Sequence, residues 1–156
     1  MLEPPLHSDQ ARLIPGTMPI SHRYTAGVAG ELFFRALADR GVFLAARCGG
    51  CGISYCPPRV FCERCFATLR AEREVGPGGR LVSVTTVRIG LDGAPLPEPV
   101  AVGLIRLEGA DTCLVHRLEP GAGWLEPGDG VEAVLLPPGE RTGSLADISH
   151  FRGVPR

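Results

Sequence analysis

The sequence predicts a mainly β protein with a small helical part near its N-terminus. Three observations support this fold class. One segment has the periodicity of an amphipathic helix, four cysteines follow it in two closely spaced pairs, and short apolar segments separated by Gly- and Pro-rich turns make up the rest. We therefore expect, in chain order, a helix, a small metal-held lobe and an antiparallel barrel.

The N-terminal part of the chain contains an arm and a helix. Residues 1–27 have neither helical nor strand periodicity, so we expect them to form an extended arm. Residues 28–41 are predicted to form one amphipathic helix, because apolar side chains recur there every three or four positions, at Val28, Leu32, Phe33, Ala36 and Leu37. Gly41 is suited to end this helix, since a residue without Cβ readily adopts the left-handed conformation.

The C-terminal half has the sequence pattern of short β-strands. Apolar segments at residues 80–89, 100–108, 112–119, 130–136 and 144–151 are separated by turn pairs such as Asp92-Gly93 and Pro120-Gly121. No segment between them is long enough for the helical crossover that parallel strands need. Five antiparallel strands fit an OB-type barrel, which we predict for residues 71–156 together with a C-terminal tail.

Four cysteines form the most specific local pattern. Two residues separate Cys48 from Cys51 and Cys62 from Cys65, and ten residues lie between the two pairs. Each pair can close a tight turn with both sulfurs on one side of a Zn²⁺ ion, and the intervening segment is long enough to bring the pairs opposite each other. We therefore predict a rubredoxin-like zinc ribbon over residues 42–70 with one structural Zn²⁺.

Two other uses of these cysteines are less consistent with the sequence. Disulfides are rare in the reducing cytoplasm, where we expect this protein to be. A catalytic zinc keeps one coordination position open, and four thiolates leave none. Of the two remaining cysteines, Cys56 is interpreted as a small buried thiol and Cys113 as a core residue of a predicted strand.

The sequence contains no self-contained active site. There is no Gly-x-Ser-x-Gly elbow, phosphate-binding loop or dinucleotide fingerprint. The four histidines belong to no zinc or triad motif and are interpreted as structural or surface groups; they are His7, His22, His116 and His150. This favours an accessory or binding protein, and we assign no catalytic residue.

Composition excludes some classes of partner. The net charge is −1, aromatic residues make up 6% of the chain, and all 16 basic residues are Arg, in no basic stripe. A nucleic-acid partner is therefore disfavoured. No apolar run approaches the length of about 18 residues that a membrane span requires, and the N-terminus has no signal-peptide pattern. We expect a cytoplasmic protein without a membrane partner.

The order of these parts, with the runs RCGGCG at residues 47–52 and YCPPRVFCERC at residues 55–65, carries a resemblance to a known family. The sequence resembles the zinc-ribbon plus OB-fold proteins, formerly a domain of unknown function, that accompany thiolase-like, acyl-CoA-processing enzymes. The resemblance covers roughly residues 30–152, and it departs from the family at Cys56, where an aromatic residue is common. It implies a non-catalytic subunit that binds a thiolase-like enzyme in a hetero-oligomer, with a hydratase as a further partner, and that helps to bind a CoA thioester.

A CoA ligand would require cationic groups for its phosphates. Arg47, Arg59 and Arg64 lie along the ribbon and Arg152 follows the last strand, so we predict this set as phosphate contacts. For each residue alone, a surface salt bridge is the alternative. Two other functions stay open from the residues: a single-stranded nucleic-acid-binding module, and a stand-alone acyl-CoA hydrolase or transferase.

Overall fold

The structure, a computed structural model, describes residue 16 and residues 24–154. The arm predicted for residues 1–27 lies almost entirely outside the described residues, so its conformation stays a prediction. Within the described part the chain forms one α-helix, a three-stranded sheet and a five-stranded sheet. None of the described helices is both long and apolar enough to cross a membrane.

Helix α1 (Gly27–Arg40) confirms the predicted helix and its end. Gly41 has a φ of 68°, and its N–H bonds to the Leu37 carbonyl at 3.1 Å. Of the five apolar positions, Phe33, Ala36 and Leu37 are buried, whereas Val28 and Leu32 are exposed. One position along a helix turns the side chain by about 100°, which places Val28 and Leu32 beside the buried stripe.

The ribbon is built on a small antiparallel sheet of order β2-β1-β3. It contains β1 (Phe43–Arg47), β2 (Ser54–Tyr55) and β3 (Ala71–Val75). Strand β3 belongs to the segment that the sequence assigned to the barrel, yet it pairs with β1. Its sequence, AEREV, has three charged, exposed residues in a row and suits the edge of either sheet, so local sequence does not decide its partner.

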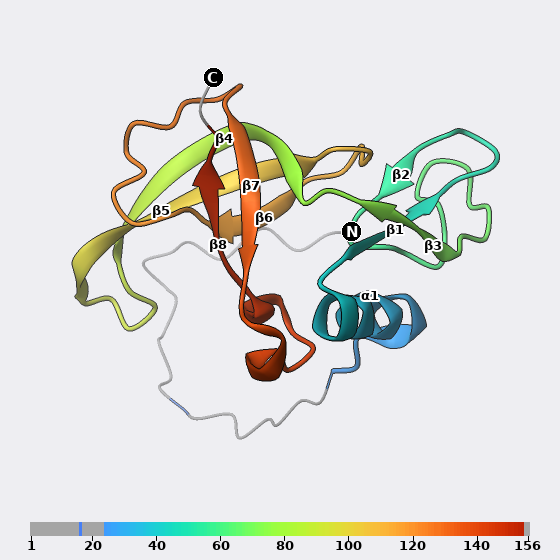
Figure 1. The fold of residues 1–156 in the computed structure, drawn as a ribbon, viewed down its shortest axis with the longest axis horizontal. Coiled ribbons are helices and arrows are strands. Elements are labelled where there is room, and N and C mark those ends of the chain that lie inside the picture. Colours follow the sequence, from blue (N-terminus) through green and yellow to red (C-terminus); the bar gives the residue numbers. More distant parts are fainter. Residues whose placement is uncertain (1–15, 17–23, 155–156) are drawn as a thin grey trace, which may run out of the picture.

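The barrel confirms the predicted five antiparallel strands. They are β4 (Gly78–Ile89), β5 (Pro95–Leu107), β6 (Leu114–Arg117), β7 (Gly130–Leu135) and β8 (Ile148–Gly153), in the sheet order β6-β5-β4-β7-β8. A bridge between Leu118 and Phe151, with the Glu119 N–H bonded to the Phe151 carbonyl at 2.9 Å, brings the two ends of the sheet together. Figure 1 shows the barrel on one side, the ribbon on the other and α1 beneath β1.

Two separate clusters of buried side chains divide the molecule. The larger one joins α1 to the barrel and includes Phe33, Phe43, Leu81 and Phe151. The ribbon has only a small cluster, made of Ala46, Cys48, Tyr55, Cys62 and Leu69. A core of this size is far too small to fold a lobe by burial alone. The ribbon therefore depends on another source of stability.

A buried carboxylate fixes the segment before β8. Asp147 lies in the 3₁₀ turn η3 (Leu145–Asp147) and is 1% exposed. Burial by itself would raise the pKa of Asp147. The carboxylate accepts hydrogen bonds from the backbone N–H groups of Thr142, Gly143 and Ser144 and from the Thr142 hydroxyl. These bonds outweigh the effect of burial, so the pKa of Asp147 lies below its usual range. The charged form is thus stabilised by folding.

We predict that Asp147→Asn lowers the free energy of unfolding by about 1–3 kcal/mol at pH 7, because several donors then face a neutral amide. Since the folded pKa is depressed, the contribution of Asp147 is present above the unfolded pKa of about 3.9 and is lost as pH falls through the lower folded value. Denaturant titrations at pH 7 and pH 3 measure the difference. Asp39→Asn, at an exposed helix position, is the control; an equal deficit at both pH values would contradict the prediction.

Candidate metal centre

Two backbone turns of the same form carry the four predicted ligands. In the first, the Cys48 N–H bonds to the Ile53 carbonyl at 2.8 Å and the Gly52 N–H bonds to the Cys48 carbonyl at 2.9 Å. In the second, the Cys62 N–H bonds to the Ala67 carbonyl and the Phe66 N–H bonds to the Cys62 carbonyl, both at 2.9 Å. We call these turns the first and the second knuckle. The spacing of two residues within each cysteine pair is what lets one knuckle present both sulfurs on the same side.

The sulfur atoms of Cys48, Cys51, Cys62 and Cys65 all lie within 4.8 Å of one another. Cys48 Sγ is 3.3 Å from Cys65 Sγ, and Cys51 Sγ is 3.4 Å from Cys62 Sγ, so each knuckle contributes one sulfur to each close pair. Tetrahedral zinc with Zn–S bonds of about 2.3 Å separates its sulfurs by about 3.8 Å. The four atoms thus surround a volume of the size that Zn²⁺ requires, and they would hold the ion with no open position.

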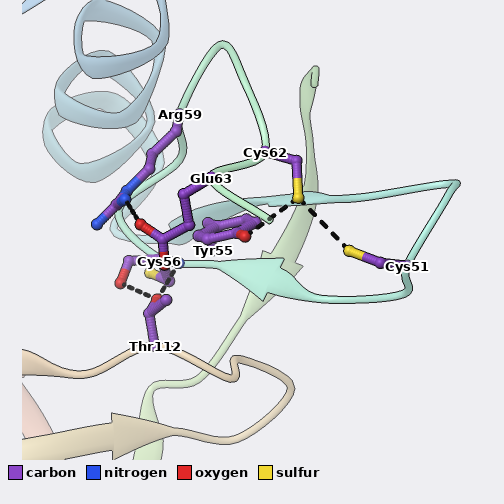
Figure 2. Close-up of polar contacts among 7 residues, drawn as sticks. All are labelled: Cys51, Tyr55, Cys56, Arg59, Cys62, Glu63 and Thr112. Carbon is purple, nitrogen blue, oxygen red and sulfur yellow. Dashed lines mark hydrogen bonds and ion pairs between the residues drawn. The ribbon is translucent and has the colours of Figure 1, made fainter. Parts of the chain in front are cut away.

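Hydrogen bonds prepare two of the sulfurs for metal binding. The Tyr55 hydroxyl lies 3.2 Å from Cys62 Sγ, and this contact, with backbone N–H groups of the second knuckle, lowers the pKa of Cys62 to about 6 (Figure 2). The proximity of the Cys62 sulfur in turn raises the pKa of Tyr55 to about 12, so the phenol keeps its proton. The Cys51 N–H lies 3.5 Å from Cys48 Sγ and lowers the pKa of Cys48. These donors favour thiolates, the form that binds zinc.

The other two sulfurs ionise less readily. The Ala67 N–H favours the Cys65 thiolate, but the sulfurs of Cys48 and Cys62 oppose a further negative charge and raise the pKa of Cys65 to about 12. For Cys51 a backbone N–H also favours the thiolate, while burial and the neighbouring sulfurs outweigh it and raise the pKa. Four thiols in one small volume compete for ionisation in this way, and a divalent cation among them removes the competition.

Tyr55 is a functional residue that sequence reasoning missed. It lies on β2, is fully buried, and supports Cys62 through its hydroxyl. The Arg59 guanidinium lies 5.4 Å from the centre of the Tyr55 ring and forms an ion pair with Glu63 (Figure 2). A tyrosine seven positions before a cysteine is not a known spacing rule, so only the fold could reveal this contact.

The ribbon is joined to the barrel by polar contacts that the sequence did not indicate. The Ser54 N–H donates to the Asp111 carboxylate at 2.8 Å, and the Asp111 N–H donates to the Ser54 carbonyl at the same distance. Next to them, the Thr112 hydroxyl contacts both the N–H and the carbonyl of Cys56, at 2.8 and 3.0 Å. Cys56 is 2% exposed and burial raises its pKa to about 12, which confirms its interpretation as a buried thiol.

The four predicted phosphate-binding arginines do not share one site. Arg59 is paired with Glu63, and Arg152 on β8 is paired with Glu132 at 2.8 Å. Arg47 lines a hollow of about 440 Å³ with four other residues of the ribbon: Thr68, Arg70, Glu72 and Arg73. Arg64 is exposed on the second knuckle. A role of these four in CoA binding stays a prediction.

The barrel contains a larger cavity of about 560 Å³. Its lining includes the apolar side chains of Val100, Leu118 and Ala122. The charged groups of the lining are Arg88, Arg117, Glu98 and Glu119. This volume is within the usual range of small-molecule sites. Sequence reasoning did not find it, because the lining comes from four separate segments of the chain.

Comparison with known proteins gives two family matches. The model described as the ChsH2 rubredoxin-like zinc ribbon domain matches residues 35–70, and that described as the ChsH2 C-terminal OB-fold domain matches residues 72–136. No curated protein sequence matches the chain.

Two solved structures have a similar fold. A protein of unknown function of the DUF35 family from Sulfolobus solfataricus has a TM-score of 0.60 and 23% identity, over 81% of this chain and 84% of that chain. The Ltp2-ChsH2(DUF35) aldolase has a TM-score of 0.59 and 23% identity, over 84% of this chain and 98% of that chain. At this identity the likeness is one of fold.

We predict one bound Zn²⁺ per chain, and its loss in Cys62→Ser, because the hydroxyl is a poor substitute for the thiolate that Tyr55 supports. Metal analysis after dialysis measures the stoichiometry, and thermal unfolding should show a less stable ribbon. Cys113→Ser, outside the cluster, is the matched control and should keep its zinc. A full equivalent of zinc in Cys62→Ser would contradict the prediction.

Tyr55→Phe tests the supporting hydrogen bond. The ring stays in the ribbon core, but Cys62 loses its donor, so we expect zinc affinity to fall by about tenfold to a hundredfold. Competition with a chromophoric chelator measures the affinity, and Tyr24→Phe, outside the ribbon, is the control. An unchanged affinity in Tyr55→Phe would show that the hydroxyl contact has no influence on the metal.

Proposed function

The chain belongs to the ChsH2 family, whose domains are a rubredoxin-like zinc ribbon and an OB fold, and on this premise we propose that it is a non-catalytic subunit of a thiolase-type complex acting on acyl-CoA thioesters. Its role is to assist assembly of the complex and binding of the CoA substrate. Thiolytic cleavage, retro-aldol cleavage and acyl transfer all fall within this reaction class. The partner supplies the catalytic groups.

The observation that carries the proposal is the closed metal centre. Four cysteine ligands leave Zn²⁺ without a position for water or substrate, so its contribution is to folding. The sulfur of Cys56 is buried and its pKa is raised to about 12, so it is a poor nucleophile. The His116 ring lies 3.3 Å from two backbone carbonyls. Cys56 and His116 thus have structural surroundings.

Two further observations support the proposal. A solved protein of the same fold is part of an aldolase whose name joins Ltp2 with ChsH2, which agrees with a subunit role. The barrel cavity offers an apolar wall for a pantetheine or acyl chain, and two guanidinium groups stand among its charged groups, beside two carboxylates. Its described lining contains no Phe, Tyr or Trp for base stacking, which favours a thioester over single-stranded nucleic acid.

The proposal predicts that the isolated, zinc-loaded protein does not turn over acyl-CoA, and that turnover requires the co-purified partner. Affinity purification of the tagged chain from its native cell, followed by a CoA-release assay on the complex and on each separated subunit, measures this. Turnover by the isolated chain would favour the stand-alone hydrolase or transferase instead.

The variant Cys48→Ser tests whether assembly of the complex depends on the zinc. Because the zinc holds the ribbon that presents Pro57, Pro58 and Arg59, we expect this variant to lose its metal and to recover at most a few per cent of the partner. Gel filtration of the co-purified material measures assembly, with Cys113→Ser as the control. A zinc-free Cys48→Ser chain that still assembled with a fully active partner would show that the ribbon is not needed.

A further inference from the structure

Phe66 has an unusual backbone conformation. Its φ is 59°, and no other non-glycine residue in the described part of the chain has a positive φ. For a side chain that branches at Cγ into a ring, the left-handed region brings Cβ close to its own carbonyl and costs free energy. Such strain persists where the surrounding structure enforces it, and it points to a functional reason for the side chain.

The two knuckles provide an internal comparison. Gly52 and Phe66 occupy the same place in them, four positions after Cys48 and Cys62, and each donates its N–H to that cysteine's carbonyl. Gly52 has a φ of 80°. The knuckle itself therefore requires a left-handed residue at this position. Glycine meets that requirement without strain, as the first knuckle demonstrates.

Packing within the chain does not explain the aromatic side chain. Phe66 is 79% exposed, and two more apolar side chains of the same hairpin, Val60 and Phe61, are 48% and 60% exposed. All three belong to one hairpin, in which Phe61 pairs with Thr68 and the Leu69 N–H bonds to the Val60 carbonyl. We call Val60, Phe61 and Phe66 the knuckle patch. The patch exposes apolar surface to solvent, and the backbone of Phe66 within it is strained. Neither feature stabilises the isolated chain.

We propose that the knuckle patch is an anchor for the partner subunit, which receives Phe66 in an apolar pocket rimmed by carboxylates. This inference rests on the proposed function, because it assigns the surface through which the complex forms. Buried aromatic side chains flanked by arginine are typical of the residues that dominate binding energy in protein interfaces.

Charge identifies the kind of partner. Arg59 is paired with Glu63, whereas Arg64, on the same knuckle, has no ion pair among the described residues. Arg64 thus offers a guanidinium without a carboxylate partner, which an acidic rim would match. A second copy docking by the same patch would place its own Arg64 opposite the first across the two-fold axis, so like charges disfavour self-association.

The decisive variant is Phe66→Gly, which gives the second knuckle the residue that the first one has. We expect it to keep its zinc and to raise the melting temperature of the isolated chain by about 2–4 °C, since strain is removed. In the complex purified with the tagged chain, we expect the partner to dissociate at least tenfold faster, measured by biolayer interferometry on the immobilised chain.

Two matched variants isolate the effect. Leu91→Gly removes a fully exposed apolar side chain from the tip of the β4–β5 hairpin and should leave assembly unchanged. Arg64→Gln should weaken assembly severalfold, and more at low salt than at high salt. Wild-type affinity of Phe66→Gly for the partner would overturn the inference, as would a fall in its melting temperature, which would make Phe66 a structural residue. The proposed function fails on a different result: a partner that binds through Phe66 but gives no turnover of CoA thioesters.

Discussion

Mutual repulsion among the four ribbon sulfurs controls this part of the molecule. The sulfurs lie within 4.8 Å of one another, and only two of them have a lowered pKa. A divalent cation converts that repulsion into attraction, and the free energy of binding, on the order of 10 kcal/mol for such sites, becomes free energy of folding. The ribbon cluster of five buried side chains could not supply a comparable amount. The two knuckles thus depend on the metal for their fold.

The metal-held lobe is attached to the rest of the chain at two separate places. Strands β1 and β3 continue directly into the core that α1 shares with the barrel, through Phe43 and Val75. On the opposite edge, β2 is tied to the barrel by the reciprocal bonds between Ser54 and Asp111. Two attachments on opposite edges of a three-stranded sheet leave little freedom to rotate. The second knuckle is consequently presented in a defined direction, which a docking surface requires.

Sequence reasoning succeeded where the determinants are local. The cysteine spacing, the helix with its terminal Gly41 and the five barrel strands all depend on patterns within about twenty residues. It failed where the determinants are distant in sequence. Pairing of β3 with β1, the support of Cys62 by Tyr55 and the contact between Cys56 and Thr112 depend on tertiary structure. Helical periodicity likewise marks an apolar side without showing how far the neighbouring elements cover it, and Val28 is in fact exposed.

The difference between Gly52 and Phe66 shows that a lobe held by a metal can tolerate a strained residue. A hairpin held only by its own packing would lose a large part of its stability to a strained, exposed Phe66. A hairpin closed by two metal ligands has stability in excess, so its surface residues can be selected for a purpose other than folding. Gly52 shows that the unstrained solution is available in the same chain. The retention of an aromatic side chain at the equivalent position is therefore better explained by what it contacts outside the chain than by anything within it.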